Sequence, residues 1–207
     1  MHFRCKIGIC ISFLVVLGAS GCYTPPAPKP MTTLKSREST VTTVKPSEKM
    51  KPYIISQLDH YFVRDWRYIV IHHSASVSGS AAEFDRYHRG KKGWENGLGY
   101  HFVIGNGNGT PDGKIEIGNR WVTQIDGAHA GVEEYNHYGI GICLVGNFNE
   151  SSPTAAQMAA LSTLVEYLQD RCHISSENVI MHRHCRQTDC PGRNFPYYKL
   201  LANTCRY

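Results

Sequence analysis

Several features that define common protein classes are missing from this sequence of 207 residues. Residues 53–207 carry 14 basic against 15 acidic residues, so they lack the cationic excess that a nucleic-acid surface requires. No two cysteines have the Cys-x-x-Cys spacing of many zinc-binding nucleic-acid modules. The apolar run 7–19 is shorter than the roughly 20 residues that a membrane-spanning helix needs. The 19 glycines follow no three-residue repeat, which excludes a collagen.

The positive charge of the chain is confined to its first quarter. Residues 1–52 contain eight basic and two acidic residues, whereas the whole chain has a net charge of only +5. In this part a basic start and the apolar run are followed by small residues and Cys22, which is typical of a secretory signal peptide. The Ala-Ser-Gly-Cys ending resembles the cleavage box of bacterial lipoproteins, which implies removal of residues 1–21 and lipid attachment to Cys22. An ordinary signal peptide and a plain membrane anchor are the alternatives.

Two further segments follow this leader. Residues 22–52 are rich in Pro, Thr, Ser and Lys and have few large apolar side chains. Such a segment cannot offset its ordering entropy, so we expect a disordered, partly stiffened linker. The 155 residues that remain (207 − 52) suit one domain with a sizeable core. We expect this exported domain to act in the cell envelope and to contact a membrane only through its lipid.

The hydrophobic pattern of the predicted domain indicates an α/β fold, in which a mixed central β-sheet is flanked by helices. The longest helix is expected to run to about Arg171, because Thr154 and Gln157 have the spacing of a capping box and the apolar residues that follow share one face. A short helix is expected at 81–89. Strands are expected at 66–71, 100–104, 140–145 and 178–182, with a hairpin formed by the segments DGKIEIG and WVTQID.

Histidine and cysteine are the residues that point most clearly to chemistry, with 11 and eight copies. They concentrate in the segments IHHS, at 71–74, and HRHCRQTDCPG, at 182–192. Each segment lies at the end of a predicted strand. A catalytic zinc site uses three His, Cys or carboxylate ligands and leaves a fourth position for water. One His from each strand and a Cys from the loop behind the second would supply such a set.

Five blocks of this sequence resemble those of a known enzyme family. In order they are VIHHSAS, GWENGLGYHFVIGNG, GAHAG, GIGICLVGNF and HRHCRQTDCPG, within about residues 66–198. They resemble the zinc amidases of the N-acetylmuramoyl-L-alanine amidase type 2 family, whose relatives include peptidoglycan-recognition proteins and phage lysozyme-amidases. Five blocks in the same order are specific, whereas single blocks are not. The resemblance implies a peptidoglycan-recognition-protein-like amidase fold and one zinc ion per domain.

The resemblance also assigns roles by position. It implies that His72, His182 and Cys190 ligate zinc. It implies catalytic roles for Tyr100, whose hydroxyl would stabilise an oxyanion, and for Thr188, at a position where some relatives have Lys. Because Thr188 carries no charge, Tyr100 would do more of the oxyanion stabilisation.

Neighbouring residues have alternative interpretations. His73 follows His72 in a strand, so we expect it to face the opposite side and pack. His184 lies two residues after His182 and is the main rival ligand. Cys143 occupies a strand position where some amidase relatives have Glu, so the general base is not identified.

The sequence leaves alternatives open for two polar residues and for the remaining cysteines. His129 and Asn136 are predicted to line a groove that contacts glycan or peptide, with turn-stabilising contacts as the alternative. Cys143 lies in an apolar strand and is expected to be a buried free thiol. An oxidising compartment would permit a disulfide among Cys172, Cys185 and Cys205. The sequence favours no particular pairing.

Together these patterns predict a monomeric zinc amidase that hydrolyses the amide between N-acetylmuramic acid and L-alanine in peptidoglycan or muropeptides. The alternative is a non-catalytic peptidoglycan-binding module, since relatives that have lost ligands bind without cutting; the presence of Cys190 favours the enzyme. A nucleic-acid-binding zinc module is disfavoured by the leader and the charge balance. The choice between polymeric peptidoglycan and small muropeptides stays open.

Overall fold

The computed structural model describes residues 51–204. In these residues five strands form one sheet: β1 (Tyr68–His73), β2 (Phe102–Ile104), β3 (Ile115–Ile117), β4 (Gly139–Leu144) and β5 (Val179–Met181). The helices are α1 (Lys51–Leu58), α2 (Ala81–Lys92), α3 (Asn119–Val122), α4 (Glu133–His137), α5 (Ala155–Cys172), α6 (His182–Cys185) and α7 (Tyr197–Thr204), with a 3-10 turn at Ser176–Asn178. The predicted leader, Cys22, the linker as far as residue 50 and Cys205 lie outside the described residues.

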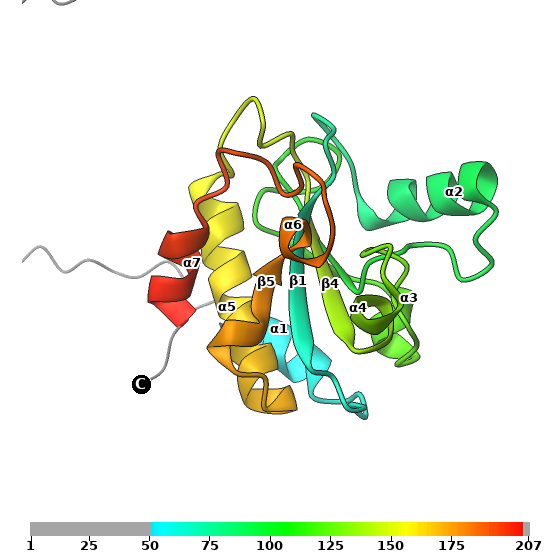
Figure 1. Ribbon diagram of the computed structural model, residues 1–207, viewed down its shortest axis with the longest axis vertical. Coiled ribbons are helices and arrows are strands. Elements are labelled where there is room, and N and C mark those ends of the chain that lie inside the picture. The colour runs from blue at the N-terminus through cyan, green and yellow to red at the C-terminus, as the bar shows by residue number, and fades with distance from the viewer. Residues whose placement is uncertain (1–50, 205–207) are drawn as a thin grey trace, which may run out of the picture. The chain divides into compact units, whose positions relative to one another are not determined.

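The sheet has the strand order β3-β2-β4-β1-β5 (Figure 1). Strands β2, β4, β1 and β5 are parallel to their neighbours, and β3 is antiparallel to β2. Because the four parallel strands run in one direction, their C-terminal ends lie at the same edge. Functional side chains of α/β proteins gather at this edge. The mixed sheet confirms the predicted fold class.

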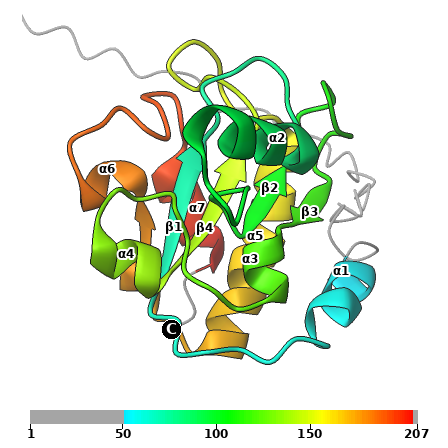
Figure 2. The same cartoon turned by 90° about the vertical axis from the view of Figure 1, so that its right-hand side faces the viewer.

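Helices lie on both sides of the sheet, with α5 and α7 on one side and α2 and α4 on the other (Figures 1 and 2). The α5 side forms the main core, where alternate strand residues such as Ile71 and Ile142 pack with Leu161 and Leu164. All four are at most 1% exposed. Full burial of one such side chain is worth roughly 1.5–3 kcal/mol. No helix in residues 51–204 combines the length and apolar character needed to span a bilayer.

The other face of the sheet carries a smaller apolar cluster of Leu98, Val103, Cys143 and Val145. Helix α2 covers part of it, although no residue of α2 is itself fully buried. His72, which is paired with Cys143 in the register of β1 and β4, and Tyr100, which packs on this cluster, lie on the same face. The fold thus separates an apolar core from a face that can hold polar side chains.

Helix α5 begins as predicted. Thr154 Oγ1 accepts a hydrogen bond from the Gln157 N–H at 3.0 Å, and Gln157 Oε1 accepts one from the Thr154 N–H at 3.1 Å. The Gln157 amide also donates to the carbonyls of Ile104 and Val145, which end β2 and follow β4. The capping box therefore joins the long helix to the C-terminal edge of the sheet.

Four of the predicted strands are present, displaced by up to two residues, but the predicted hairpin is wrong. Strand β3 forms from its first half, whereas its second half contains α3 and a turn. Trp121 is fully buried against Phe102, with ring centroids 5.0 Å apart. Gln124 has a φ of 53°, which a strand does not allow. The segment is rich in residue types that favour strands, but it forms a helix and a turn because Trp121 is buried in the core.

Candidate metal centre

Segments far apart in sequence meet at the C-terminal edge of the sheet. Strand β1 ends with His72 and His73, and α6 begins with His182 directly after β5. The loop after α6 returns to β1, where the His73 N–H donates a hydrogen bond to Cys190 Sγ at 3.4 Å. One ligand atom from each of His72, His182 and Cys190 lies within 4.8 Å of the others. The structure therefore brings together the three predicted ligands.

The alternation of side chains along β1 separates its two histidines. His72 is 1% exposed, and its ring centroid lies 4.5 Å from that of His182. His73 faces the other side, where its Nδ1 accepts a hydrogen bond from the Phe148 N–H at 3.0 Å. Its ring packs against that of Phe148. The prediction that His73 packs on the opposite face is confirmed.

Burial sets the protonation of the three grouped side chains. It lowers the pKa of His72 well below the usual value, and the nearby histidines 129 and 182 lower it further. It also lowers the pKa of His182. Burial raises the pKa of the Cys190 thiol to about 12, despite the hydrogen bond from His73. At neutral pH the group therefore consists of two neutral imidazoles and one protonated thiol.

The chemistry of this donor set fits zinc. Imidazole nitrogen and thiolate sulfur are both zinc donors, and a catalytic site with three protein ligands leaves a place for water. Cys190 Sγ lies 3.7 Å from His72 Nδ1. His182 Nε2 lies 3.0 Å from the carbonyl oxygen of Ala130, to which only an N–H can donate. His182 Nδ1 therefore keeps the lone pair that a metal needs.

Tyr100 lies beside the three candidate ligands, just before β2 rather than inside the predicted strand. Its ring centroid is 5.3 Å from that of His72. Burial raises the pKa of Tyr100 well above the usual value, and the nearby Cys143 and Cys190 raise it further. The hydroxyl, whose hydrogen-bond partner is Cys143, therefore stays protonated at neutral pH and can act as a donor.

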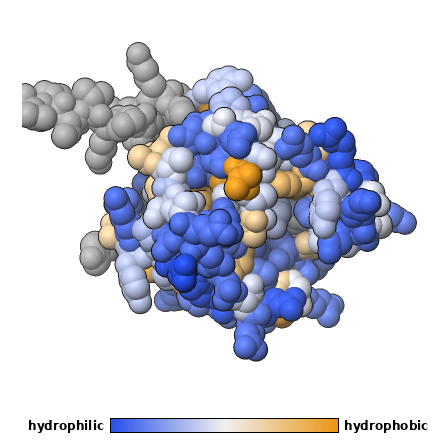
Figure 3. Space-filling view, turned by 90° about the horizontal axis from the view of Figure 1, so that it is seen from above, coloured by the Kyte–Doolittle hydropathy of each residue, from blue (hydrophilic) through white to orange (hydrophobic). Residues whose placement is uncertain are grey.

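A depression of about 370 Å³ opens beside Tyr100. It is lined by serines of the β1–α2 loop and by one side of α2: Ser74, Ser76, Ser78, Phe84, Tyr87 and His88. The His88 ring centroid lies 6.0 Å from that of Tyr100. Figure 3 views the molecule from above and shows a mainly hydrophilic surface with small apolar patches. Sequence reasoning missed Tyr87 and His88, because nothing in a polar helix indicates which side lines a site.

Thr188 and His184 lie on the loop and helix that carry the late ligands. Thr188 Oγ1 accepts a hydrogen bond from the Cys190 N–H at 3.3 Å, so it contacts the backbone of the ligand loop. His184 is exposed, and its Nδ1 accepts a hydrogen bond from the Met181 N–H at 3.4 Å. It does not belong to the group of converging ligand atoms found in the described residues. His184, the rival ligand, therefore does not join His72 and Cys190.

His129 and Asn136 have structural contacts, which favours the turn-stabilising alternative over the predicted groove. His129 is only 8% exposed, and its Nδ1 lies 3.0 Å from His72 Nε2. Burial lowers the pKa of His129 to about 4, so its ring is neutral at neutral pH. Asn136 Oδ1 accepts hydrogen bonds from the N–H groups of His129 and Ala130, each at 2.9 Å. Both residues therefore support the ligands from behind.

Sequence reasoning also missed the contacts that hold the ligand loop. The Arg183 N–H donates to the carbonyl of Cys190 at 3.0 Å. Arg183 Nη2 donates to the carbonyls of Asp189 and Gly192 at 3.0 and 2.6 Å. No sequence signal identifies this role, since an Arg beside a ligand is equally common on a solvated surface.

The cysteines of the described residues are free. Cys143 is fully buried on the same face as Tyr100, which confirms the predicted buried thiol. Burial raises its pKa well above the usual value, so it does not replace the carboxylate that some relatives have. Cys172 and Cys185 are also free, and no disulfide forms within residues 51–204.

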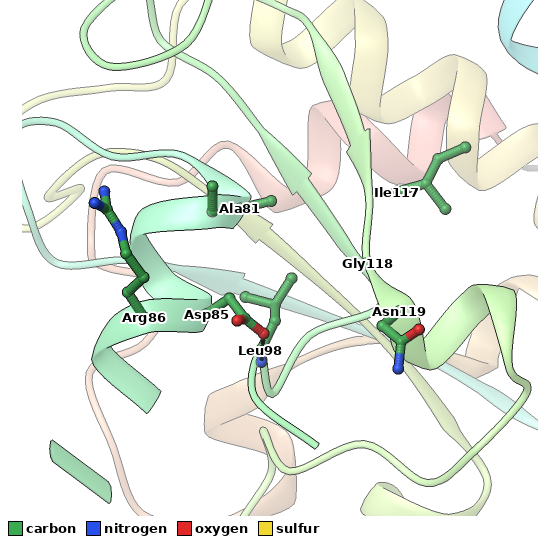
Figure 4. Close-up of a pocket in the computed structure, with 8 residues that line it drawn as sticks. Ala81, Asp85, Arg86, Leu98, Ile117, Gly118 and Asn119 are labelled. Carbon is green, nitrogen blue, oxygen red and sulfur yellow. Dashed lines mark hydrogen bonds between the residues drawn. The ribbon is translucent and has the colours of Figure 1, made fainter. Parts of the chain in front are cut away.

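A second depression lies apart from the candidate ligands, between α2 and the turn that joins β3 to α3 (Figure 4). Its volume is about 630 Å³, and it is open to solvent. Asp85 lies at its edge, where it accepts a hydrogen bond from the Leu98 N–H at 2.8 Å. Because Asp85 also pairs with Arg89 at 2.8 Å, its charge is already compensated.

Comparisons with known proteins agree with this geometry. A family model described as N-acetylmuramoyl-L-alanine amidase matches residues 62–193. Peptidoglycan-recognition protein SC2 of Drosophila melanogaster is 35% identical over 136 residues, which cover 61% of this chain and 68% of that protein. The solved structure of the N-acetylmuramoyl-L-alanine amidase LysC from Clostridium intestinale URNW has a TM-score of 0.57 and 34% identity, covering 67% of this chain and 84% of that one.

Another solved structure is that of peptidoglycan recognition protein-LE in complex with tracheal cytotoxin, a monomeric diaminopimelic acid-type peptidoglycan. It has a TM-score of 0.54 and 29% identity, and covers 65% of this chain and 79% of that one. These similarities confirm that this chain has the predicted α/β fold, which resembles that of peptidoglycan-recognition proteins.

Proposed function

Because this chain belongs to the N-acetylmuramoyl-L-alanine amidase family, we propose that it is a zinc-dependent amidase that cleaves the bond between N-acetylmuramic acid and the L-alanine of a stem peptide. The observation that carries the proposal is the convergence of His72, His182 and Cys190, whose ligand atoms lie within 4.8 Å of one another, beside Tyr100. A binding module has no need of three converging metal ligands next to a protonated phenol.

The three ligands would hold a zinc ion. A bound zinc ion supplies a Lewis acid and lowers the pKa of a water molecule to about 7. The protein contributes neutral His72 and His182 and the sulfur of Cys190, which releases its proton on binding. The single negative charge of the thiolate would leave the loaded centre with a net positive charge, which favours an anionic transition state.

Tyr100 stabilises the oxyanion in this proposal. Attack of water on the lactyl carbonyl of the muramoyl group moves negative charge to the carbonyl oxygen. A neutral phenol aimed at that oxygen is a donor worth roughly 2.7–4 kcal/mol in comparable sites. The raised pKa of Tyr100 keeps the proton on the hydroxyl across the neutral range. Thr188 adds an uncharged hydroxyl on the ligand loop, and we assign it the weaker catalytic role.

The substrate in this proposal is a peptidoglycan fragment or polymer that extends from the centre along α2. Peptidoglycan recognition protein-LE, which shares this fold, has been solved in complex with a monomeric peptidoglycan. The depression beside Tyr100 offers serine hydroxyls and the exposed Tyr87, groups that bind sugars and peptides through hydrogen bonds and ring contacts. We propose that this depression receives part of the substrate.

The test is mass spectrometry of the products that the purified full-length chain forms from defined muropeptides. We expect a free L-alanine-terminated peptide and an intact sugar, with loss of both products after chelation and recovery on addition of zinc. His182→Ala should abolish turnover, whereas the matched His184→Ala should keep it. Unchanged turnover in His182→Ala would overturn the proposal. Muropeptide binding without cleavage by the zinc-loaded chain would favour the non-catalytic module.

The location of the enzyme is a separate proposal that rests on the sequence of the leader. We propose export to the cell envelope, lipid attachment at Cys22 and a monomeric catalytic domain. Radiolabelled fatty acid should enter the wild-type chain but not the Cys22→Ala variant. Equal labelling of both chains would count against the anchor, and light scattering of residues 53–207 would test the monomer.

A further inference from the structure

The carbonyl of Gly139 starts a chain of hydrogen bonds that ends at a metal ligand. This oxygen can only accept, so His129 Nε2, at 3.1 Å, carries the proton. His129 Nδ1 of the neutral ring is then an acceptor, and His72 Nε2, at 3.0 Å, must donate to it. The lone pair of His72 is thereby placed on Nδ1, the nitrogen that lies 3.7 Å from Cys190 Sγ.

The residue after His129 orients the second histidine ligand in the same way. The carbonyl oxygen of Ala130 accepts a hydrogen bond from His182 Nε2 at 3.0 Å, which leaves the lone pair of His182 on Nδ1. Two consecutive residues of one loop therefore hold two ligands that are 110 positions apart in the chain (182 − 72). In both histidines the nitrogen that keeps the lone pair is the one that these hydrogen bonds leave free to bind a metal.

This loop is itself fixed by its surroundings. Asn136 Oδ1 accepts from both the His129 and Ala130 N–H groups, and the Asn136 carbonyl accepts from the Gly127 N–H at 2.8 Å. Two glycines make room for the His129 ring. A Cβ at Gly127 would lie 2.3 Å from His129 Cδ2, and one at Gly141 would lie 2.4 Å from the same atom. Both positions therefore require the absence of a side chain.

We propose that residues 127–130 form a positioning loop that selects the tautomer and orientation of both histidine ligands, with His129 as the positioning residue for His72 and Asn136 as the support of the loop. The inference deepens the proposed function, since it rests on a metal bound at His72, His182 and Cys190. It gives the GAHA segment a role behind the metal rather than in the substrate groove. Partners of this kind typically change metal affinity by about 10–100-fold.

The first test compares two substitutions at one position. His129→Leu removes the acceptor, whereas His129→Asn offers Oδ1 near the place of Nδ1. Zinc affinity is measured for the full-length chain by competition with a chromophoric chelator, and the absorption spectrum of the cobalt-substituted protein reports ligand geometry. We expect His129→Leu to bind zinc about 10–100-fold more weakly with an altered cobalt spectrum, and His129→Asn to recover most of the affinity. His184→Leu is the matched control, and it should behave as wild type.

The second pair tests the support and remains informative if His129→Leu fails to fold. Asn136→Ala removes the acceptor that holds the loop, while Asn136→Asp keeps an acceptor oxygen. Only the first should weaken zinc binding. Wild-type zinc affinity and cobalt spectrum in His129→Leu or in Asn136→Ala would overturn the inference. Equal losses in His129→Leu and His129→Asn would do the same, because the acceptor would then be irrelevant. A wild-type chain that binds zinc but cleaves no muropeptide would contradict only the proposed function.

Discussion

Replacement of Tyr100 by Phe is the sharpest test of how the centre would stabilise charge. The substitution removes one hydroxyl and keeps the ring that packs 5.3 Å from His72. Burial raises the pKa of this hydroxyl well above the usual value, so it keeps its proton at neutral pH and can donate. Loss of one oxyanion donor lowers kcat by about 10²–10³-fold, or about 2.7–4 kcal/mol. The upper half of that range is expected here, because Thr188 provides no charge in compensation.

The same substitution should leave the fold and the metal site almost unchanged. The substitution removes the hydrogen bond between the Tyr100 hydroxyl and Cys143, which contributes about 1 kcal/mol to the free energy of unfolding. The assay is kcat and KM on one defined muropeptide, with zinc content and urea denaturation measured on the same samples. Tyr87→Phe is the matched control, because Tyr87 lines the same depression but is 53% exposed and lies on α2.

Two results would refute this reasoning. Wild-type kcat in Tyr100→Phe would show that the hydroxyl donates nothing to the transition state. Loss of zinc from the variant in proportion to its loss of activity would show that the ring merely supports the ligands. A fall in kcat with full zinc content and little change in KM is the expected result, since the donor acts on charge that develops only in the transition state.

Three further predictions follow from the protonation states and from the cap of α5. The thiol of Cys190 has a pKa of about 12 and must lose its proton to bind zinc. The apparent zinc affinity should therefore rise about tenfold per pH unit from about pH 7 to 8, as measured by competition titrations. A zinc affinity that does not change with pH would exclude the thiolate ligand. The pKa of His129 is about 4 when folded and about 6.5 when unfolded, so the unfolded state binds the proton first as pH falls. In chelator-treated protein this residue should reduce the free energy of unfolding by about 2 kcal/mol between pH 7.5 and 5, and His129→Asn should lose that dependence. Thr154→Ala should lower the free energy of unfolding by about 1 kcal/mol in urea without altering zinc affinity, because it removes the capping bond to Gln157 far from the ligands.

Local sequence patterns were sufficient to predict much of the candidate site. The β-branched run that ends at His72 predicts a buried strand, and alternation along it separates His72 from His73. The capping box at Thr154 predicts the start of the longest helix. The order of the five blocks identified the family and the three residues that converge. Each of these inferences depends on residues close in sequence, or on a resemblance that already contains the long-range information.

The sequence did not predict the contacts between segments that are far apart in the chain. WVTQID has the residue types of a strand, but burial of Trp121 against Phe102 makes it a helix and a turn. His129 and Asn136 resemble exposed groove residues until the ring of His129 is seen against His72. The sequence by itself determined which residues are the candidate ligands and on which side of a strand His72 and His73 lie, because side-chain type and strand period are local properties. Only the tertiary structure decided which nitrogen of each histidine keeps its lone pair, because that choice depends on a hydrogen-bond partner dozens of residues away.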